Sequence, residues 1–197
     1  MDQPKALLLD FGGVIIPINP DYTKDAMISL GVKDSLPSVD FEDFETGKIS
    51  ADEFISKWPA ATWTMKSDVV SAWNALLEPI PEETLAYLKR LKKDYKLYLV
   101  SNTNPIHIEA IRKQLGLFGW KQFCSLFEKM YFSYEIGERK PNAAFYEHVL
   151  KDAKLKAEDC LFVDDTPANI EAAEKLGIPS MFHDSDEMSI LDLDKAL

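Results

Sequence analysis

The sequence predicts an α/β protein with a Rossmann-like three-layer core, built on a parallel sheet, and a small inserted α-helical cap. Two observations predict the core of this fold. Short apolar runs at residues 6–9, 97–100 and 161–163 are bounded by polar residues, as expected for strands buried on both faces. Two of these runs are followed by a helical pattern that ends at a glycine. Such alternation is typical of a parallel sheet with helices on both faces.

The core elements after the insertion follow one another in a regular order. Pro81 and the two glutamates after it suit the first turn of a helix, because proline fits there and acidic groups favour the positive helix end. The predicted elements are then a strand at 97–100, a helix at 106–115 stopped by Gly116, a strand at 129–133, a helix at 143–153, a strand at 161–163, a helix at 167–176 stopped by Gly177, and a strand at 179–182.

Between residues 19 and 79 the pattern changes to helices without clear strands. Ser50-Ala-Asp-Glu53 has the spacing of a capping box, which marks a helix start. We therefore expect residues 1–18 and 80–197 to form the core and residues 19–79 to form the cap. The helices expected in the cap span residues 21–30, 50–57 and 67–77.

Two further groups of side chains are expected to have structural roles. Helical spacing predicts that most of the cap aromatics form the cap's own core. The three histidines lie on different elements without ligand spacing, which favours surface or capping positions. The aromatics are Phe41, Phe44, Phe54, Trp58, Trp63 and Trp73, and the histidines are His107, His148 and His183.

Composition excludes several classes of function. A chain of 197 residues with 46% hydrophobic residues can bury a substantial core. The net charge of −11 disfavours binding to nucleic acid. Cys124 and Cys160 form no C-x-x-C pair, which favours a reducing compartment over a disulfide framework. The apolar run before Asp10 is too short for a signal peptide or a membrane span, so no membrane association and a cytoplasmic location are expected.

Polar side chains follow the predicted strands at the points where they end. Because ligands of parallel sheets bind beyond the carboxyl ends of the strands, Asp10, Ser101, Lys140 and the pair Asp164-Asp165 are expected in one crevice. Clustered carboxylates repel one another unless a cation lies among them, and Mg²⁺ is the natural ion for oxygen ligands. A lysine and a hydroxyl beside it suggest a phosphoryl group as the ligand.

Four motifs, in this order, resemble those of the haloacid dehalogenase-like hydrolase superfamily. They are Asp10-Phe11-Gly12-Gly13-Val14, Ser101 in S-N-T-N, Lys140-Pro141 in G-E-R-K-P-N, and Asp164-Asp165 in F-V-D-D-T-P-A-N. The helical insertion resembles the α-helical caps of that family, and the resemblance covers nearly the whole chain.

The resemblance implies Mg²⁺-dependent hydrolysis of a small phosphomonoester, such as a sugar phosphate. Asp10 would attack phosphorus and form an aspartyl-phosphate that water then hydrolyses. Ser101, Asn102 and Lys140 would hold the phosphoryl oxygens, with Lys140 also offsetting the charge of Asp10. The implied Mg²⁺ ligands are Asp10, the backbone carbonyl of Gly12, Asp165, and Asp164 directly or through water.

Gly12 departs from the family pattern. Most family phosphatases carry an aspartate there that protonates the leaving oxygen, and a general acid contributes about 10²–10⁴-fold in rate. Family dehalogenases lack this aspartate, but they also lack the acidic pair. The presence of Asp164-Asp165 therefore argues against a dehalogenase. Family phosphonatases recruit a cap lysine, and Lys48, Lys57 and Lys66 are equally available. The subgroup resembling bacterial α-glucose-1-phosphate phosphatases fits best, because it keeps both the glycine and the metal site.

Two other functions stay open. In a phosphotransferase or mutase of the same family, the aspartyl-phosphate would pass to a sugar hydroxyl. A non-catalytic descendant would bind a phosphorylated ligand without turnover, and Gly12 is the only feature that favours it. For the enzyme, our hypothesis is that the substrate, a water molecule or a cap residue supplies the missing proton.

Overall fold

A computed structural model of the protein describes residues 3–32, 41–58, 64–195 and 197. Its centre is a five-stranded parallel sheet in the order β3-β2-β1-β4-β5, which confirms the predicted fold class. The first strand therefore lies in the middle of the sheet, between β2 and β4. The strands are β1 (Ala6–Leu9), β2 (Lys96–Ser101), β3 (Lys129–Phe132), β4 (Cys160–Asp164) and β5 (Ser180–Phe182).

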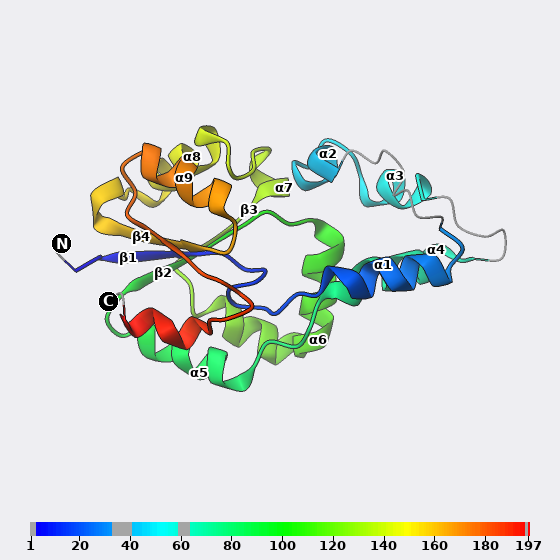
Figure 1. Cartoon of the computed structure of the whole chain (residues 1–197), viewed down its shortest axis with the longest axis horizontal. Helices are drawn as coiled ribbons and strands as arrows, with labels where there is room; N and C mark the ends of the chain where they lie inside the picture. The colour runs from blue at the N-terminus through cyan, green and yellow to red at the C-terminus, as the bar shows by residue number, and fades with distance from the viewer. Residues whose placement is uncertain (1–2, 33–40, 59–63, 196) are drawn as a thin grey trace.

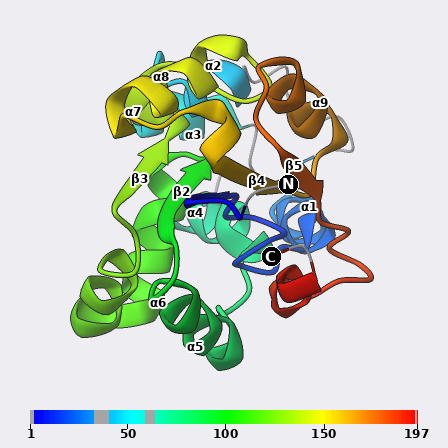
Figure 2. The same cartoon turned by 90° about the vertical axis from the view of Figure 1, so that its left-hand side faces the viewer.

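Helices cover both faces of the sheet, as Figures 1 and 2 show. Side chains alternate along β1, so that Leu7 and Leu9 pack in one hydrophobic cluster while Ala6 and Leu8 pack in the other. The first cluster includes residues of α5 (Glu82–Leu91) and α6 (Pro105–Cys124), and the second includes residues of α8 (Ala143–Ala153) and α9 (Pro167–Lys175).

The helix predictions are largely confirmed, with two corrections. The helix expected at 67–77 is an α-helix only over Lys66–Trp73 (α4) and continues as a 3₁₀ turn at Asn74–Leu76 (η1). The sequence predicts that the helix from residue 106 stops at Gly116, and Gly116 is indeed non-helical, with φ 66°. The chain then resumes a helical path to Cys124, which the prediction missed. Several short elements were also not predicted, because three to six residues carry little periodic pattern. They are α2 (Phe41–Glu45), α7 (Ser133–Ile136), η2 (Ala157–Asp159) and η3 (Ile190–Lys195).

The helical insertion extends beyond the carboxyl ends of the strands (Figure 1). The predicted capping box is confirmed, with Ser50 and Glu53 bonding reciprocally at the start of α3. Besides α2, the described helices of the insertion are α1 (Pro20–Ser29), α3 (Ala51–Ser56), α4 (Lys66–Trp73) and η1 (Asn74–Leu76).

The aromatic side chains of the insertion pack in a third hydrophobic cluster, which Ile106 of α6 also joins. Phe44, Phe54 and Trp58 are buried in it, as expected, whereas Phe41 and Trp73 are only partly buried against it. The sixth aromatic residue, Trp63, lies outside the described residues.

The segments that enter and leave the insertion lie side by side. The Asn19 amide donates to the Leu76 carbonyl at 2.9 Å, and the Glu78 amide donates to the Pro17 carbonyl at 3.1 Å. This pairing and the separate hydrophobic cluster support our proposal that the chain divides into a core (1–18 and 80–197) and a cap (19–79).

Two smaller expectations concern the membrane and the cysteines. None of the described helices has the length and apolarity needed to cross a membrane. Cys124 and Cys160 are both free thiols.

Phe162, in the middle of β4, offers a test of the packing of the core. It is fully buried, its ring packs edge-on against Tyr146 at 5.6 Å, and the Lys140 ammonium lies 5.4 Å from its centroid. We expect Phe162→Ala to lower the free energy of unfolding by about 3–5 kcal/mol, measured by urea titration, because the site cannot refill the lost volume. The matched control Phe118→Ala, at a side chain 81% exposed, should change it by less than about 0.5 kcal/mol. Equal effects of the two variants would contradict this assignment of the core.

Candidate active site

The strand order brings three of the motif residues together. Leu9 pairs with Leu99 of β2 on one side and with Val163 of β4 on the other. Asp10 therefore leaves the sheet between the ends of these two strands, which carry Ser101 and Asp164. One carboxylate oxygen each of Asp10, Asp164 and Asp165 lies within 4.8 Å of the others. The predicted convergence of the acidic motifs is thus present in the structure.

Lys140 reaches the same point from the loop before α8. Its Nζ contacts Asp10 Oδ1 at 2.7 Å and Asp164 Oδ2 at 2.6 Å, and it donates to the Val100 carbonyl at 2.8 Å. These three contacts match the three protons of an ammonium group. The side chain is only 1% exposed, so the contacts replace its entire hydration.

Asn102 holds the Lys140 backbone in place. Its amide nitrogen donates to the Lys140 carbonyl at 2.8 Å, and its amide oxygen accepts from the Lys140 amide at 2.9 Å. This reciprocal pair explains how two motifs 38 residues apart meet at fixed distance. The Asn102 amide thus already has two partners. Its contact with phosphate stays a prediction.

The charges of the site act strongly on one another. Burial raises the pKa of Asp10 to about 7, with Lys140 lowering it and Asp164 raising it. Burial alone lowers the pKa of Lys140, but Asp10 and Asp164 outweigh it and the net pKa is raised, so Lys140 is a cation. The pKa of Asp165 is also raised, by burial and then by Asp164. A further positive charge among these groups relieves the repulsion.

Asp164 and Asp165 differ in how they are bound. Asp164 is completely buried and accepts from Lys140 Nζ, from the Thr166 amide at 2.8 Å and from Asn169 Nδ2 at 2.9 Å. Asp165 is half-buried, and its carboxylate accepts a longer bond, at 3.3 Å, from the Thr166 hydroxyl. The oxygens of Asp164 are thus largely used within the protein, whereas Asp165 retains capacity for another ligand.

Glycine suits positions 12 and 13 for different physical reasons. Gly13 adopts φ +75°, and a Cβ there would lie 2.0 Å from Asp165 Oδ2. Only glycine lets the Asp165 carboxylate approach so closely. At Gly12 a Cβ would lie 3.3 Å from Ile18 Cδ1, so a larger residue would have to push Ile18 aside.

The site fits the Mg²⁺ that the motifs predict. Its candidate ligands are hard carboxylate oxygens, and the three acidic groups outnumber the single ammonium by two charges. A divalent cation with oxygen coordination matches both features.

Sequence reasoning missed several residues that shape this region. The Ser133 hydroxyl accepts from the Thr103 amide at 3.0 Å and donates to the Thr103 carbonyl at 3.1 Å, which ties the Ser101 loop to the start of α7, directly after β3. Arg139, beside Lys140, contacts Glu42 and Glu45 of α2 at 3.0 Å each. Thr103, Arg139 and Asn169 had a local signal, since each lies within one of the four quoted motifs, whereas Ser133, Glu42 and Glu45 had none.

The histidine expectation was wrong for two residues. His183 is buried, and the partly buried His107 ring stacks on Trp73 with centroids 5.1 Å apart.

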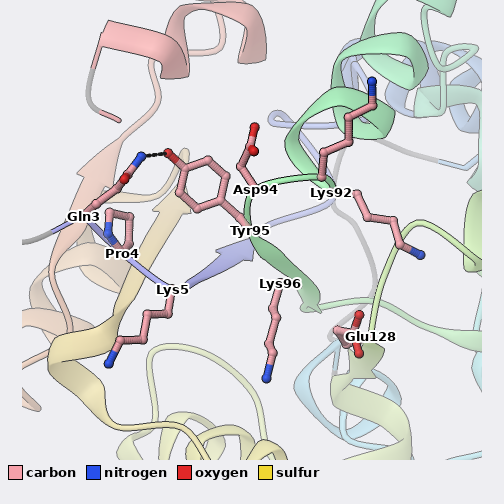
Figure 3. A pocket seen from close by; sticks show the side chains of 9 residues that line it. Gln3, Pro4, Lys5, Lys92, Asp94, Tyr95, Lys96 and Glu128 are labelled. Carbon is pink, nitrogen blue, oxygen red and sulfur yellow. Dashed lines mark hydrogen bonds between the residues drawn. The ribbon is translucent and has the colours of Figure 1, made fainter.

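A cavity of about 710 Å³ lies at the other end of the sheet, where the strands begin. Figure 3 shows its lining, in which Gln3 bonds to the Tyr95 hydroxyl and the lysine side chains spread along the rim without converging. Because parallel sheets bind ligands at the carboxyl ends of their strands, this cavity is not the active site.

Comparison with known proteins gives a consistent result. The haloacid dehalogenase-like hydrolase family matches residues 4–177. A D-ribitol-5-phosphate phosphatase from Bacteroides thetaiotaomicron is 33% identical over 184 residues, 88% of each chain. A sesquiterpene phosphatase from Aspergillus oryzae is 30% identical over 179 residues, 88% of this chain and 87% of the relative.

A solved structure shares the fold over nearly the whole chain. It is a haloacid dehalogenase family enzyme from Bacteroides thetaiotaomicron, in complex with magnesium and inorganic phosphate. It superposes with a TM-score of 0.85 at 29% identity, covering 94% of this chain and 96% of its own. These relatives support the predicted phosphatase subgroup, whereas none of these names mentions glucose 1-phosphate. The chain therefore belongs to the haloacid dehalogenase-like hydrolase family, as its four motifs predict.

Proposed function

We propose that the protein is a Mg²⁺-dependent phosphatase that hydrolyses a small phosphomonoester through an aspartyl-phosphate on Asp10. The observation that carries the proposal is the buried Lys140 ammonium between Asp10 and Asp164, with Asp165 beside them. The phosphatase names of two relatives and the magnesium and phosphate in the similar structure support it.

In this proposal Asp10 is the nucleophile. Lys140 binds its Oδ1, which fixes the orientation of the carboxylate and favours its ionised form. One Asp10 oxygen forms a bond to phosphorus while the bond from phosphorus to the leaving oxygen breaks, and water later cleaves the aspartyl-phosphate. Ser101 and Lys140 are proposed to bind the phosphoryl oxygens, with Asn102 positioning the Lys140 loop.

Asp10, the Gly12 carbonyl and Asp165 are proposed to hold Mg²⁺. Asp165 is favoured as the direct ligand of the acidic pair because Asp164 already accepts from three protein donors. When bound, Mg²⁺ would offset the charge of the phosphoryl oxygens and of the clustered carboxylates. Asp164 then serves mainly to position Lys140.

The substrate is proposed to be a small phosphorylated metabolite. Both relatives are named phosphatases, but one name refers to a polyol phosphate and the other to a sesquiterpene. The two names therefore do not identify the leaving group of the substrate of this protein. We also propose a cytoplasmic location and no nucleic-acid partner, which the two free thiols and the charge of −11 support.

Asp10→Asn tests the nucleophile. We expect phosphate release from phenyl phosphate with Mg²⁺ to fall by more than about 10³-fold, because the amide cannot form the aspartyl-phosphate. The control Asp25→Asn, at an exposed position of α1, should retain full activity. Thermal unfolding of both variants shows whether the loss is chemical. Sustained activity of folded Asp10→Asn would exclude Asp10 as the nucleophile.

Gly13→Ala tests the metal site. The added methyl would overlap Asp165 Oδ2, so we expect the carboxylate to move and the Mg²⁺ affinity, measured by calorimetry, to fall by at least about tenfold. Gly119→Ala, in α6, is the matched control, because its new Cβ meets only Leu115 Cβ at 3.4 Å. Unchanged Mg²⁺ binding in Gly13→Ala would remove Asp165 from the proposed ligand set.

A further inference from the structure

A largely apolar cavity of about 530 Å³ lies in the cap, and His107 of the core also lines it. Its walls come from α1, α2, the α4–η1 segment and the first turn of α6. The lining side chains include Met27, Ile28, Phe41, Trp73, Leu76 and His107.

One lining residue connects the cavity to the proposed active site. Glu45 pairs with Arg139, the neighbour of Lys140 in the chain, and the charge of Lys140 acts on Glu45. His107, also in the lining, lies in the first turn of α6, the helix that follows the loop of Ser101. Figure 1 shows that α1 and α2 both lie beyond the carboxyl ends of the strands.

One wall of the cavity is an aromatic stack that joins the cap to the core. Trp73 stacks on Phe41 at 5.7 Å and 17°, and on His107 at 5.1 Å and 10°. Burial lowers the pKa of His107 to about 4, so its ring is neutral at physiological pH. The stack is therefore an uncharged aromatic part of the cavity lining.

Beside the aromatic stack, two polar groups of the described lining are already paired. The Thr23 hydroxyl donates to the Trp73 carbonyl and accepts from the Leu76 amide, each at 3.1 Å. His107 Nδ1 bonds to Asn74 Oδ1 at 2.8 Å. A polyol hydroxyl held against the stack would lose hydration there, and unpaired polar groups are unfavourable when buried.

The charges around the cavity disfavour a second anionic group on the substrate. Among the described lining residues, Asp21 and Glu45 are acidic and Lys24 is basic. The nearby Arg139 is already paired with Glu42 and Glu45. A carboxylate or second phosphate in the cavity would thus meet more repulsion than attraction.

We propose that the leaving group of the substrate is an uncharged, largely apolar alcohol that packs against the Phe41–Trp73–His107 stack. The inference rests on the proposed phosphatase function and deepens it. Phosphomonoesters of apolar alcohols are then the preferred class, ahead of polyol phosphates and of substrates with a second anionic group.

The test compares hexyl phosphate, ribitol 5-phosphate and 6-phosphogluconate, with phenyl phosphate as a reference for basal activity. All three test compounds are phosphates of primary alcohols, so differences in kcat/KM report mainly on the cavity. We expect hexyl phosphate to exceed the other two by at least about tenfold.

Ile28→Asn adds a polar group to the cavity lining at a side chain already 45% exposed, where folding should tolerate it. It should lower kcat/KM for hexyl phosphate by about tenfold and leave ribitol 5-phosphate unchanged or improved. Leu117→Asn, at a 70% exposed position outside the cavity lining, is the matched control and should change neither.

The outcomes separate the two proposals. If phenyl phosphate is hydrolysed but ribitol 5-phosphate or 6-phosphogluconate equals or exceeds hexyl phosphate, the apolar leaving group is refuted and the phosphatase stands. The apolar leaving group is also refuted if Ile28→Asn affects the compounds equally. If the wild-type protein with Mg²⁺ hydrolyses none of the four, the phosphatase proposal fails and this inference fails with it.

Discussion

The buried ammonium of Lys140 is the interaction on which the rest of the site depends. It lies between two carboxylates, at 2.7 Å from Asp10 and 2.6 Å from Asp164, with almost no exposure to water. A buried ion is tolerated only when its partners replace its hydration, and removing one partner typically costs about 3–5 kcal/mol. The strand order, the Asn102 amide and the Asn169 amide all hold these three groups at their distances.

The loop after β1 packs closely against the Asp165 carboxylate and against Ile18. Gly13 gives Asp165 room beside the Asp10 loop, while Gly12 lies against Ile18, at the start of the path to the cap. Glycine at position 12, where most family phosphatases carry an aspartate, is therefore compatible with the packing against Ile18 and with the acidic cluster. The proton for the leaving group then has to come from the substrate, a water molecule or a cap residue.

The cap contacts the core through both charge and backbone. Arg139 links the loop of Lys140 to Glu42 and Glu45, and Gly47, at φ +70°, lets the chain after α2 approach the Tyr134 carbonyl, which a Cβ would meet at 2.4 Å. Burial raises the pKa of Glu45 and Arg139 partly offsets this. The cap segment around α2 is thus attached to the loop that carries Lys140.

The sequence by itself determined the strands, the order of the motifs and the meeting of Asp10, Lys140 and Asp164-Asp165 beyond the strand ends. These follow from local patterns, since a buried strand and a strand-ending polar residue are both visible within about ten residues. Only the tertiary structure decided that Asn102 bonds to Lys140, that Arg139 joins the cap, and that Trp73 and His107 line a cavity. The physical reason is that such contacts join residues tens of positions apart, and their geometry is set by how whole elements pack.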